Sequence, residues 1–251
     1  MTQADAQPLA GQTALITGGA RRLGAAIARA LHAQGANVVI HHLKSTQEAA
    51  ALIAAFNAAR PESAIAVQAD LLDVARLPEL AVAATRGFGR LDILINNASS
   101  FYATPIGAIT LAQFDDLFGT NFRAPLFLAQ AVAPELRRRR GLILNMVDIH
   151  GIKPLKGYPT YSSAKAALIM LTKSLARELA PDVRVNGIAP GPVMFPADVD
   201  VAMQAEIIDK TLLKRSGDPQ DIGKAALYFA AMAPYVTGQI LAVDGGRSLT
   251  G

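Results

Sequence analysis

The chain has 251 residues, 51% of them apolar, and a formal net charge of +4. Such a chain is long enough for one well-packed α/β domain, residues 1–251, without a second core. It has no cysteine, which excludes disulfides and thiolate metal sites, and it shows neither a signal peptide nor an apolar run long enough to span a bilayer. We therefore expect a soluble, cytoplasmic protein.

Short apolar runs alternate along the chain with longer segments of helical periodicity. The predicted strands are Ala14 to Thr17, Val38 to His41, Ala64 to Gln68, Leu91 to Asn96, Leu142 to Val147, Val183 to Ile188 and Ile240 to Val243. The predicted helices are Leu23 to Gln34, Thr46 to Ala59, Val74 to Phe88, Leu111 to Leu136, Tyr161 to Leu179 and Pro219 to Met232. This alternation implies a parallel sheet covered on both faces, with its ligand crevice beyond the carboxyl ends of the strands.

A glycine-rich turn, Thr17-Gly-Gly-Ala-Arg-Arg-Leu-Gly24, follows the first strand. Its glycines permit a tight turn and let the next helix approach a pyrophosphate. Its place between a strand and a helix favours nucleotide binding over a purely structural turn. The residues that we assign to this contact are Gly18, Arg22, Leu23 and Gly24.

The second strand ends in His41-His42-Leu-Lys44-Ser45, where an NAD-selective site would normally carry an acidic residue. Lys44 and Ser45, together with Arg22 and with His41 or His42, instead suit a 2′-phosphate, which favours NADP(H). The alternative is a solvated loop.

Asp70, with Leu71 beside it, follows the third strand. It would either accept a hydrogen bond from an adenine amino group or cap the helix that follows.

The fourth strand leads into Asn97-Ala98-Ser99-Ser-Phe101, which we expect at the crevice. Phe101 would either stack on a planar ring or belong to the core. In the next long helix, Asn121 would either break the hydrogen-bond ladder and hold a water or simply be exposed.

Tyr161 and Lys165 lie four residues apart and therefore share one face of a helix. A phenol has an ordinary pKa of about 10, and a nearby ammonium lowers it, which would make Tyr161 a proton donor. The alternative is that the pair lies on an ordinary solvated helix face. Asp148 closes the preceding apolar strand.

Two other stretches have simpler interpretations. The cluster Arg137 to Arg140 stands where a helix gives way to a strand, which favours a solvated helix end over a nucleic-acid patch. The longest irregular segment, Pro190 to roughly Ser216, is long enough for a mobile lid over the crevice.

Taken together, these landmarks resemble the short-chain dehydrogenase/reductase family along essentially the whole chain. They are the glycine-rich turn, Asp70, Asn96-Asn-Ala, Asn121, Tyr161-x-x-x-Lys165, Pro190-Gly191 and Val243-Asp-Gly-Gly246. The resemblance implies a single-domain Rossmann-type sheet of seven parallel strands with helices on both faces. It further implies a nicotinamide cofactor, Tyr161 as the acid, Lys165 at the nicotinamide ribose and Asn121 as the anchor of a relay water.

The sequence departs from the family pattern at two positions, and at both it resembles the pteridine reductase branch of the family. Arg22 replaces the middle glycine of the turn, and Asp148 replaces the usual catalytic serine. The run Asn97-Ala-Ser-Ser-Phe-Tyr-Ala-Thr-Pro105 matches that branch, whereas Leu43 stands where the branch often has a polar residue.

This resemblance implies NADPH-dependent reduction of a C=N bond in a pterin or dihydropterin, such as dihydrobiopterin, dihydromonapterin or dihydrofolate. Asp148 would partner Tyr161 in proton transfer. Phe101 would form a stacking wall, while Arg22 and Ser99 would meet the polar edge of the pterin and the cofactor. Pro190, Gly191 and Val193 would line the cofactor, and Met194 and Phe195 would either close over the substrate or pack within the lid.

The family resemblance also implies a homotetramer. Two alternatives remain open: a family reductase acting on a carbonyl or enoyl substrate, and a non-catalytic NADP(H)-binding sensor.

Overall fold

The structure, a computed structural model, describes residues 7–195 and 199–250, so the ends of the predicted domain, residues 1–6 and 251, lie outside it. A seven-stranded sheet runs through its centre in the order β3-β2-β1-β4-β5-β6-β7, and all neighbouring strands are parallel. The strands are β1 Thr13–Ile16, β2 Asn37–His42, β3 Ala64–Gln68, β4 Ile93–Asn96, β5 Leu142–Met146, β6 Arg184–Pro190 and β7 Ile240–Val243. The predicted fold class is confirmed.

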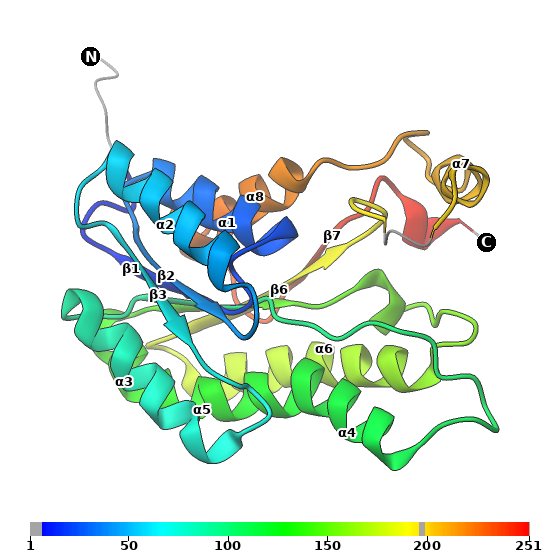
Figure 1. The fold of residues 1–251 in the computed structure, drawn as a ribbon, viewed down its shortest axis with the longest axis horizontal. Helices are drawn as coiled ribbons and strands as arrows, with labels where there is room; N and C mark the ends of the chain where they lie inside the picture. Colours follow the sequence, from blue (N-terminus) through cyan, green and yellow to red (C-terminus); the bar gives the residue numbers. More distant parts are fainter. Residues whose placement is uncertain (1–6, 196–198, 251) are drawn as a thin grey trace.

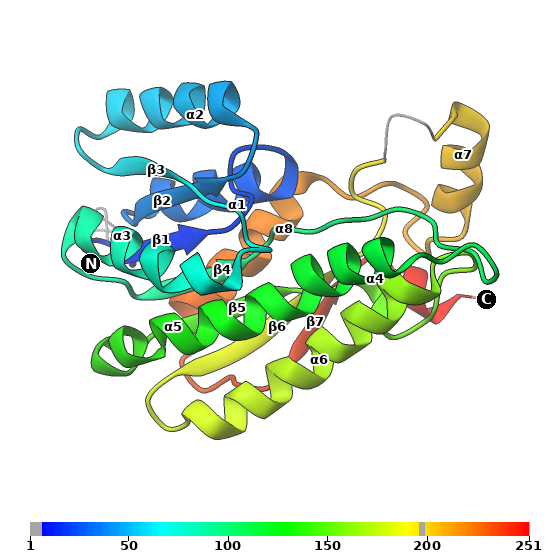
Figure 2. The same ribbon diagram turned by 60° about the horizontal axis from the view of Figure 1, so that its bottom comes forward.

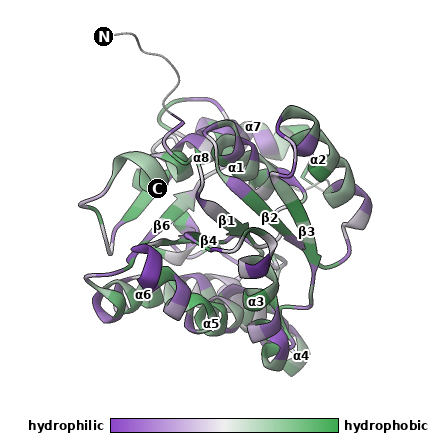
Figure 3. Ribbon diagram, turned by 90° about the vertical axis from the view of Figure 1, so that its left-hand side faces the viewer, coloured by the Kyte–Doolittle hydropathy of each residue, from purple (hydrophilic) through white to green (hydrophobic). Residues whose placement is uncertain are grey.

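Two layers of helices cover the sheet (Figure 1). One face carries α1 Arg22–Ala33, α2 Thr46–Ala59 and α8 Pro219–Leu227, and the other carries α3 Leu77–Phe88, α5 Ala124–Arg139 and α6 Pro159–Leu179. Short 3₁₀ segments lie at Val74–Arg76, Ile149–Gly151 and Arg247–Leu249, and π-helical segments at Gly119–Arg123 and Tyr228–Met232. Figure 3 shows the sheet between the two layers. No helix within the described ranges is long and apolar enough to cross a membrane.

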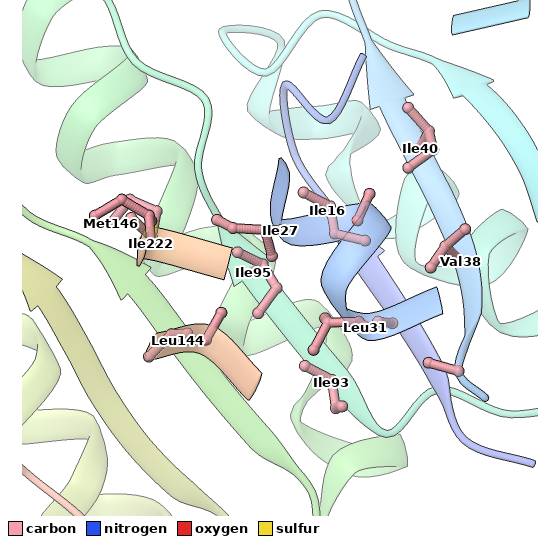
Figure 4. Close-up of a cluster of buried hydrophobic side chains, with 14 of the residues drawn as sticks. Ile16, Ile27, Leu31, Val38, Ile40, Ile93, Ile95, Leu144, Met146 and Ile222 are labelled. Carbon is pink, nitrogen blue, oxygen red and sulfur yellow. The ribbon is translucent and has the colours of Figure 1, made fainter. Parts of the chain in front are cut away.

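The strands are apolar on both sides because helices cover both faces of the sheet. Successive strand residues point to opposite faces. Ile95 packs with Ile27 and Ile222 on the α1 and α8 side (Figure 4), whereas Leu94 belongs to the cluster that contains Leu128 of α5. Burying one such side chain contributes about 1.5–3 kcal/mol, so the strands form a rigid support for the residues at their ends.

The predicted helix Leu111 to Leu136 is interrupted. α4 Leu111–Phe118 is followed by the π-helical segment Gly119–Arg123 before α5 begins. Within this segment Asn121 is buried, and its Nδ2 donates to the Leu117 carbonyl at 2.9 Å. The interpretation of Asn121 as an exposed helix residue is therefore wrong, and the predicted local break in the ladder is confirmed.

The predicted irregular segment from Pro190 to Ser216 contains a helix, α7 Val201–Asp209, and residues 196–198 of it lie outside the described residues. Asp200 caps α7 by accepting from the Met203 N–H at 2.7 Å. None of the residues of α7 is buried, so its apolar side chains pack against no other part of the described chain as core residues would. Figure 2 shows α7 standing apart from the two helical layers.

Candidate active site

The glycine-rich turn after β1 is held against the end of β4 by Thr17 and Asn97. The Thr17 hydroxyl accepts from the backbone N–H groups of Asn97 and Ala98 at 2.9 and 3.0 Å. Asn97 Nδ2 in turn donates to the carbonyls of Thr17 and Gly18 at 2.9 and 3.1 Å. The carboxyl ends of two adjacent strands are thereby fixed together, as expected for the ligand edge of a parallel sheet.

Glycine is required at two positions of this turn. Gly18 has φ +58°, and a Cβ there would lie 3.0 Å from the Ala98 Cα. A Cβ on Gly24 would lie 2.4 Å from the Gly18 carbonyl oxygen. These close approaches bring the start of α1, whose backbone N–H groups are free to bind an anion, to the crevice.

Arg22 stands in the left-handed region, with φ +50°, at the start of α1. A non-glycine residue there costs about 1–3 kcal/mol, so the turn retains an arginine at a position that favours glycine. Its exposed side chain crosses to the lid segment, where Nη2 donates to the Met194 carbonyl at 3.4 Å.

His41 does not face a phosphate, contrary to one of the two sequence interpretations. It is buried, its Nδ1 accepts from the Gly18 N–H at 3.2 Å, and its Nε2 lies 3.1 Å from the Ala69 carbonyl. These partners require the neutral tautomer that carries its proton on Nε2. Desolvation by burial lowers the pKa of His41 to about 4. His41 therefore clamps the glycine-rich turn to the end of β3, and its part in the site is indirect.

The residues that follow His41 are more open. Lys44 is exposed, Ser45 is half-buried just ahead of α2, and His42 is buried with a ring nitrogen, Nδ1, that has no hydrogen-bond partner in the described part of the chain. After β3, Asp70 Oδ1 accepts from the Leu72 N–H at 2.9 Å. Asp70 thus caps a turn ahead of α3, and its contact with adenine stays a prediction.

Ser99 and Asn121 connect the end of β4 to the π-helical segment. Ser99 Oγ donates to Asn121 Oδ1 at 2.7 Å, and Asn121 Nδ2 donates to the carbonyls of Ser100 and Leu117, both at 2.9 Å. The Asn121 side chain is therefore fully engaged in positioning Ser99. Its role as the anchor of a relay water stays a prediction.

Asp148 and Tyr161 meet at the end of β5. Tyr161 Oη donates to Asp148 Oδ2 at 2.7 Å, while Asp148 Oδ1 accepts from the His150 N–H at 2.7 Å. The backbone contact fixes the carboxylate, so that its second oxygen is aimed at the phenol.

Lys165 lies beneath this pair, one helical turn after Tyr161. It is buried, and its Nζ donates to the Met146 carbonyl at 2.9 Å and lies 5.7 Å from the centroid of the Tyr161 ring. Desolvation by burial lowers the pKa of Lys165 to about 8, and the negative charge of Asp148 opposes that change.

The expectation that Lys165 lowers the pKa of Tyr161 is wrong for this chain. Burial raises the pKa of Tyr161 well above its ordinary value, the charge of Asp148 and its hydrogen bond raise it further, and the Ser99 hydroxyl acts weakly in the opposite direction. Tyr161 therefore holds its proton at neutral pH. Neutralising the charge on Asp148 would remove one of the causes of this raised pKa and leave the effect of burial.

Phe101 and Tyr158 form an aromatic corner beside Tyr161. The Phe101 ring stacks on Tyr158, with centroids 4.8 Å apart and planes inclined by 15°, and meets Tyr161 edge-on at 4.8 Å. Phe101 is 41% exposed, so it does not belong to the core. The sequence analysis missed Tyr158, although its position three residues before Tyr161 offered a signal.

The chain after β6 combines buried and open residues. Gly191 donates its N–H to the Val243 carbonyl at 3.0 Å, and a Cβ on Gly191 would lie 2.6 Å from the Asp244 Cα. Val193 belongs to the core, whereas Met194 is exposed and Phe195 half-buried. The carboxyl ends of β1, β2, β4, β5 and β6 thus lie along one edge of the sheet, which we call the catalytic edge.

Comparisons with known proteins match nearly the whole chain. A family model described as enoyl-(acyl carrier protein) reductase matches residues 18–248. Pteridine reductase 1 of Leishmania tarentolae is 40% identical, with 94% of this chain and 96% of that protein covered. The 3-oxoacyl-[acyl-carrier-protein] reductase FabG of Staphylococcus epidermidis is 34% identical, with 94% and 98% covered. A blue fluorescent protein from a metagenomic library, solved in complex with NADPH, superposes with a TM-score of 0.89 at 33% identity, covering 96% of this chain and 99% of its own.

Proposed function

Since the chain belongs to the short-chain dehydrogenase/reductase family of oxidoreductases, we propose that it is an NADPH-dependent pteridine reductase. It would convert a pterin or dihydropterin to the tetrahydro form. The observation that carries this proposal is the 2.7 Å hydrogen bond from Tyr161 to Asp148, beside the exposed ring of Phe101. The similarity to a pteridine reductase supports it.

The residues at the start of α1 fit a dinucleotide. Gly18 and Gly24 leave no space for a Cβ, so ligand phosphates can approach the backbone of the turn. No acidic residue follows β2, while exposed Lys44 and the neighbouring Ser45 suit a 2′-phosphate. Lys165 would hold the nicotinamide ribose, and Pro190, Gly191 and Val193 would line the nicotinamide end. NADPH, when bound there, supplies the hydride for the reaction.

Tyr161 and Asp148 would supply the proton that the substrate nitrogen gains. A C=N bond that gains a hydride at carbon must gain a proton at nitrogen. Tyr161 Oη holds a proton at neutral pH, and a proton on Asp148 would neutralise the charge that, in addition to burial, raises the pKa of Tyr161. Asp148 would then return a proton to the phenol after its transfer. A serine at position 148 has neither effect.

The flat surface of the substrate would lie against Phe101. One face of that ring is covered by Tyr158, and the partial exposure of Phe101 leaves it accessible to a planar heterocycle. Ser99, held by Asn121, and Arg22, which reaches the Met194 carbonyl, would bind the polar edge. Met194 and Phe195 would close over it.

NADPH oxidation followed spectroscopically tests this function. Dihydrobiopterin, dihydrofolate, dihydromonapterin and a small panel of carbonyl compounds are supplied in turn. We expect oxidation with at least one pteridine at a kcat/KM above that for every carbonyl compound. An absence of oxidation with all pteridines would refute the proposal.

A second candidate function is reduction of a carbonyl or enoyl group on an acyl chain. The family description and the similarity to a 3-oxoacyl reductase favour it. Activity on acyl substrates without activity on pteridines would establish it. Cofactor binding without turnover of any substrate would instead indicate the more distant alternative, a sensor.

Replacing Arg22 by glycine should stabilise the fold and weaken substrate binding. The Arg22→Gly variant relieves the left-handed backbone, so its free energy of unfolding should rise by about 1 kcal/mol. Loss of a charged hydrogen-bond donor should raise the KM for the pteridine by roughly 10-fold or more. Denaturant unfolding and steady-state kinetics measure the two effects.

The matched control is Arg21→Gly. Arg21 is extended, with φ −139°, and its exposed side chain contacts Glu48. This variant should gain no stability and keep the KM of the wild type. An unchanged KM in Arg22→Gly would remove Arg22 from the substrate site.

We further propose that the enzyme is a cytoplasmic homotetramer that pairs through α4, α5 and α6. Exposed apolar side chains on these helices support the proposal: Leu111, Phe114, Phe127 and Met170. Light scattering on the purified chain would give the assembly mass.

A further inference from the structure

The arginine cluster that the sequence analysis assigned to a solvated helix end lines a pocket on the far side of the molecule from the catalytic edge. This pocket has a volume of about 190 Å³ and lies at the amino ends of β1, β4, β5 and β6. Its charged lining residues are Arg90, Asp92, Arg139, Arg140 and Arg184. In Figure 2 the end of α5, which carries two of these arginines, lies opposite α7 and the start of α6.

The carboxylates in and beside the pocket already accept hydrogen bonds from other protein groups. Asp92 accepts from Arg90 Nη2 and Nε at 2.6 and 2.8 Å and from the Thr13 N–H at 2.9 Å. Glu135, just outside the pocket, is bonded to both Arg138 and Arg139. Two arginines of the pocket therefore face it without a carboxylate partner.

These two are Arg184 and Arg140. Arg184 Nη1 donates only to main-chain carbonyls, those of Phe229 and Ala233 at 2.9 and 3.1 Å, and partial burial lowers the pKa of its guanidinium. The Arg140 side chain has no hydrogen-bond or ion-pair partner within residues 7–195 and 199–250. Arg140 is exposed, whereas Arg184 is half-buried, and a partly desolvated guanidinium without a carboxylate partner gains free energy from a counter-ion.

The backbone of Arg140 supplies a second, independent observation. It ends α5 in the left-handed conformation, with φ +52° and ψ +49°, where helices commonly place glycine. An arginine there costs about 1–2 kcal/mol relative to a relaxed backbone. The helix end thus carries a residue with a strained backbone that lines the basic pocket, and such strain occurs at binding sites.

We propose that this pocket binds a phosphate group, either inorganic phosphate or the phosphomonoester of a small metabolite. Two uncompensated guanidinium groups match the charge of a dianion, and their planar forks match the geometry of phosphate oxygens. The volume corresponds to about six water molecules, which accommodates a phosphate and a few further atoms but not a nucleotide. Because it lies away from the catalytic edge, the ligand would bind together with the cofactor.

The test measures binding of inorganic phosphate to the full chain kept saturated with NADPH, so that the phosphate contacts of the cofactor site are already occupied. Melting temperature is recorded against phosphate concentration, with sodium chloride at equal ionic strength as the blank. We expect a saturable increase with phosphate that chloride does not reproduce. In Arg140→Gly, which removes the strained backbone together with the charge, half-saturation should require at least about 10-fold more phosphate.

Arg137→Gln is the matched control, because it removes the same charge one helical turn away, outside the pocket lining. It should bind phosphate like the wild type. A repeat with glycerol 3-phosphate distinguishes the two sources: tighter binding than phosphate indicates an ester, and equal binding indicates the free ion. The proposal is overturned if chloride gives the same stabilisation as phosphate. It is also overturned if Arg140→Gly responds to phosphate as the wild type and Arg137→Gln do.

Discussion

The variant Asp148→Asn should lose pteridine turnover by a factor of about 10²–10⁴, the usual contribution of a general acid–base group. An asparagine retains an oxygen that accepts from the His150 N–H, so the turn at 149–151 should keep its shape. Its amide, however, can neither take the proton of Tyr161 nor return one. We expect an unchanged Kd for NADPH, measured by fluorescence titration, alongside the loss in kcat.

Asp148→Ser is a second test variant, since the family pattern usually carries serine at this position. It should also lose pteridine turnover while binding NADPH normally. If either variant reduces pteridines at the wild-type rate, Asp148 acts only in local structure, and its hydrogen bond to Tyr161 has no part in the reaction.

The variant Lys165→Met should change how stability depends on pH. The pKa of Lys165 falls from 10.5 to about 8 in the folded protein, a difference that corresponds to about 3 kcal/mol. Between these values the unfolded chain holds the proton more tightly than the folded chain, so deprotonation favours folding. The wild type should therefore gain about 3 kcal/mol relative to Lys165→Met as the pH rises from 7 to 10.5. Urea unfolding of both proteins across this range measures the difference.

Lys173→Met provides the matched control, because Lys173 lies exposed on the same helix. Its stability should follow the wild type in parallel at every pH. Lys165→Met should in addition lose most of its reductase activity, because it removes the proposed ribose contact. Parallel pH profiles for Lys165→Met and wild type would show that the buried ammonium is not destabilising.

The strands and most helices could be predicted because their signals are local. Continuous apolar runs bounded by turn residues identified all seven strands, and Thr46–Ala59 matches its predicted helix. The break at Asn121 was harder to predict, since an asparagine inside a helix either points to solvent or bonds back to the preceding turn. Only burial decides between these, and burial depends on the whole fold. α7 was missed although Val201, Ala205 and Ile208 recur at helical spacing, because the whole segment from Pro190 to Ser216 was interpreted as irregular.

The positions of the site residues could be predicted from the sequence, but their pKa values and hydrogen-bond partners could not. The positions of Asp148, Tyr161 and Lys165 were predicted from the resemblance to the short-chain dehydrogenase/reductase family, and the three side chains lie together. The direction of the Tyr161 pKa did not follow, because it depends on desolvation and on which charge lies closest. Likewise, the partners of His41 lie in turns 23 and 28 residues away, beyond the reach of any local pattern.

The hydrogen bonds by which His41 holds the glycine-rich turn should not change with pH. An imidazole whose pKa is about 4 remains neutral across the whole range in which most proteins are stable, so its hold on Gly18 and Ala69 does not vary with pH. The pKa of the buried Lys165 is about 8, so the charge of this side chain changes in the alkaline range. Along the catalytic edge, pH therefore alters the charge next to Tyr161, while the hydrogen bonds that hold the glycine-rich turn stay constant.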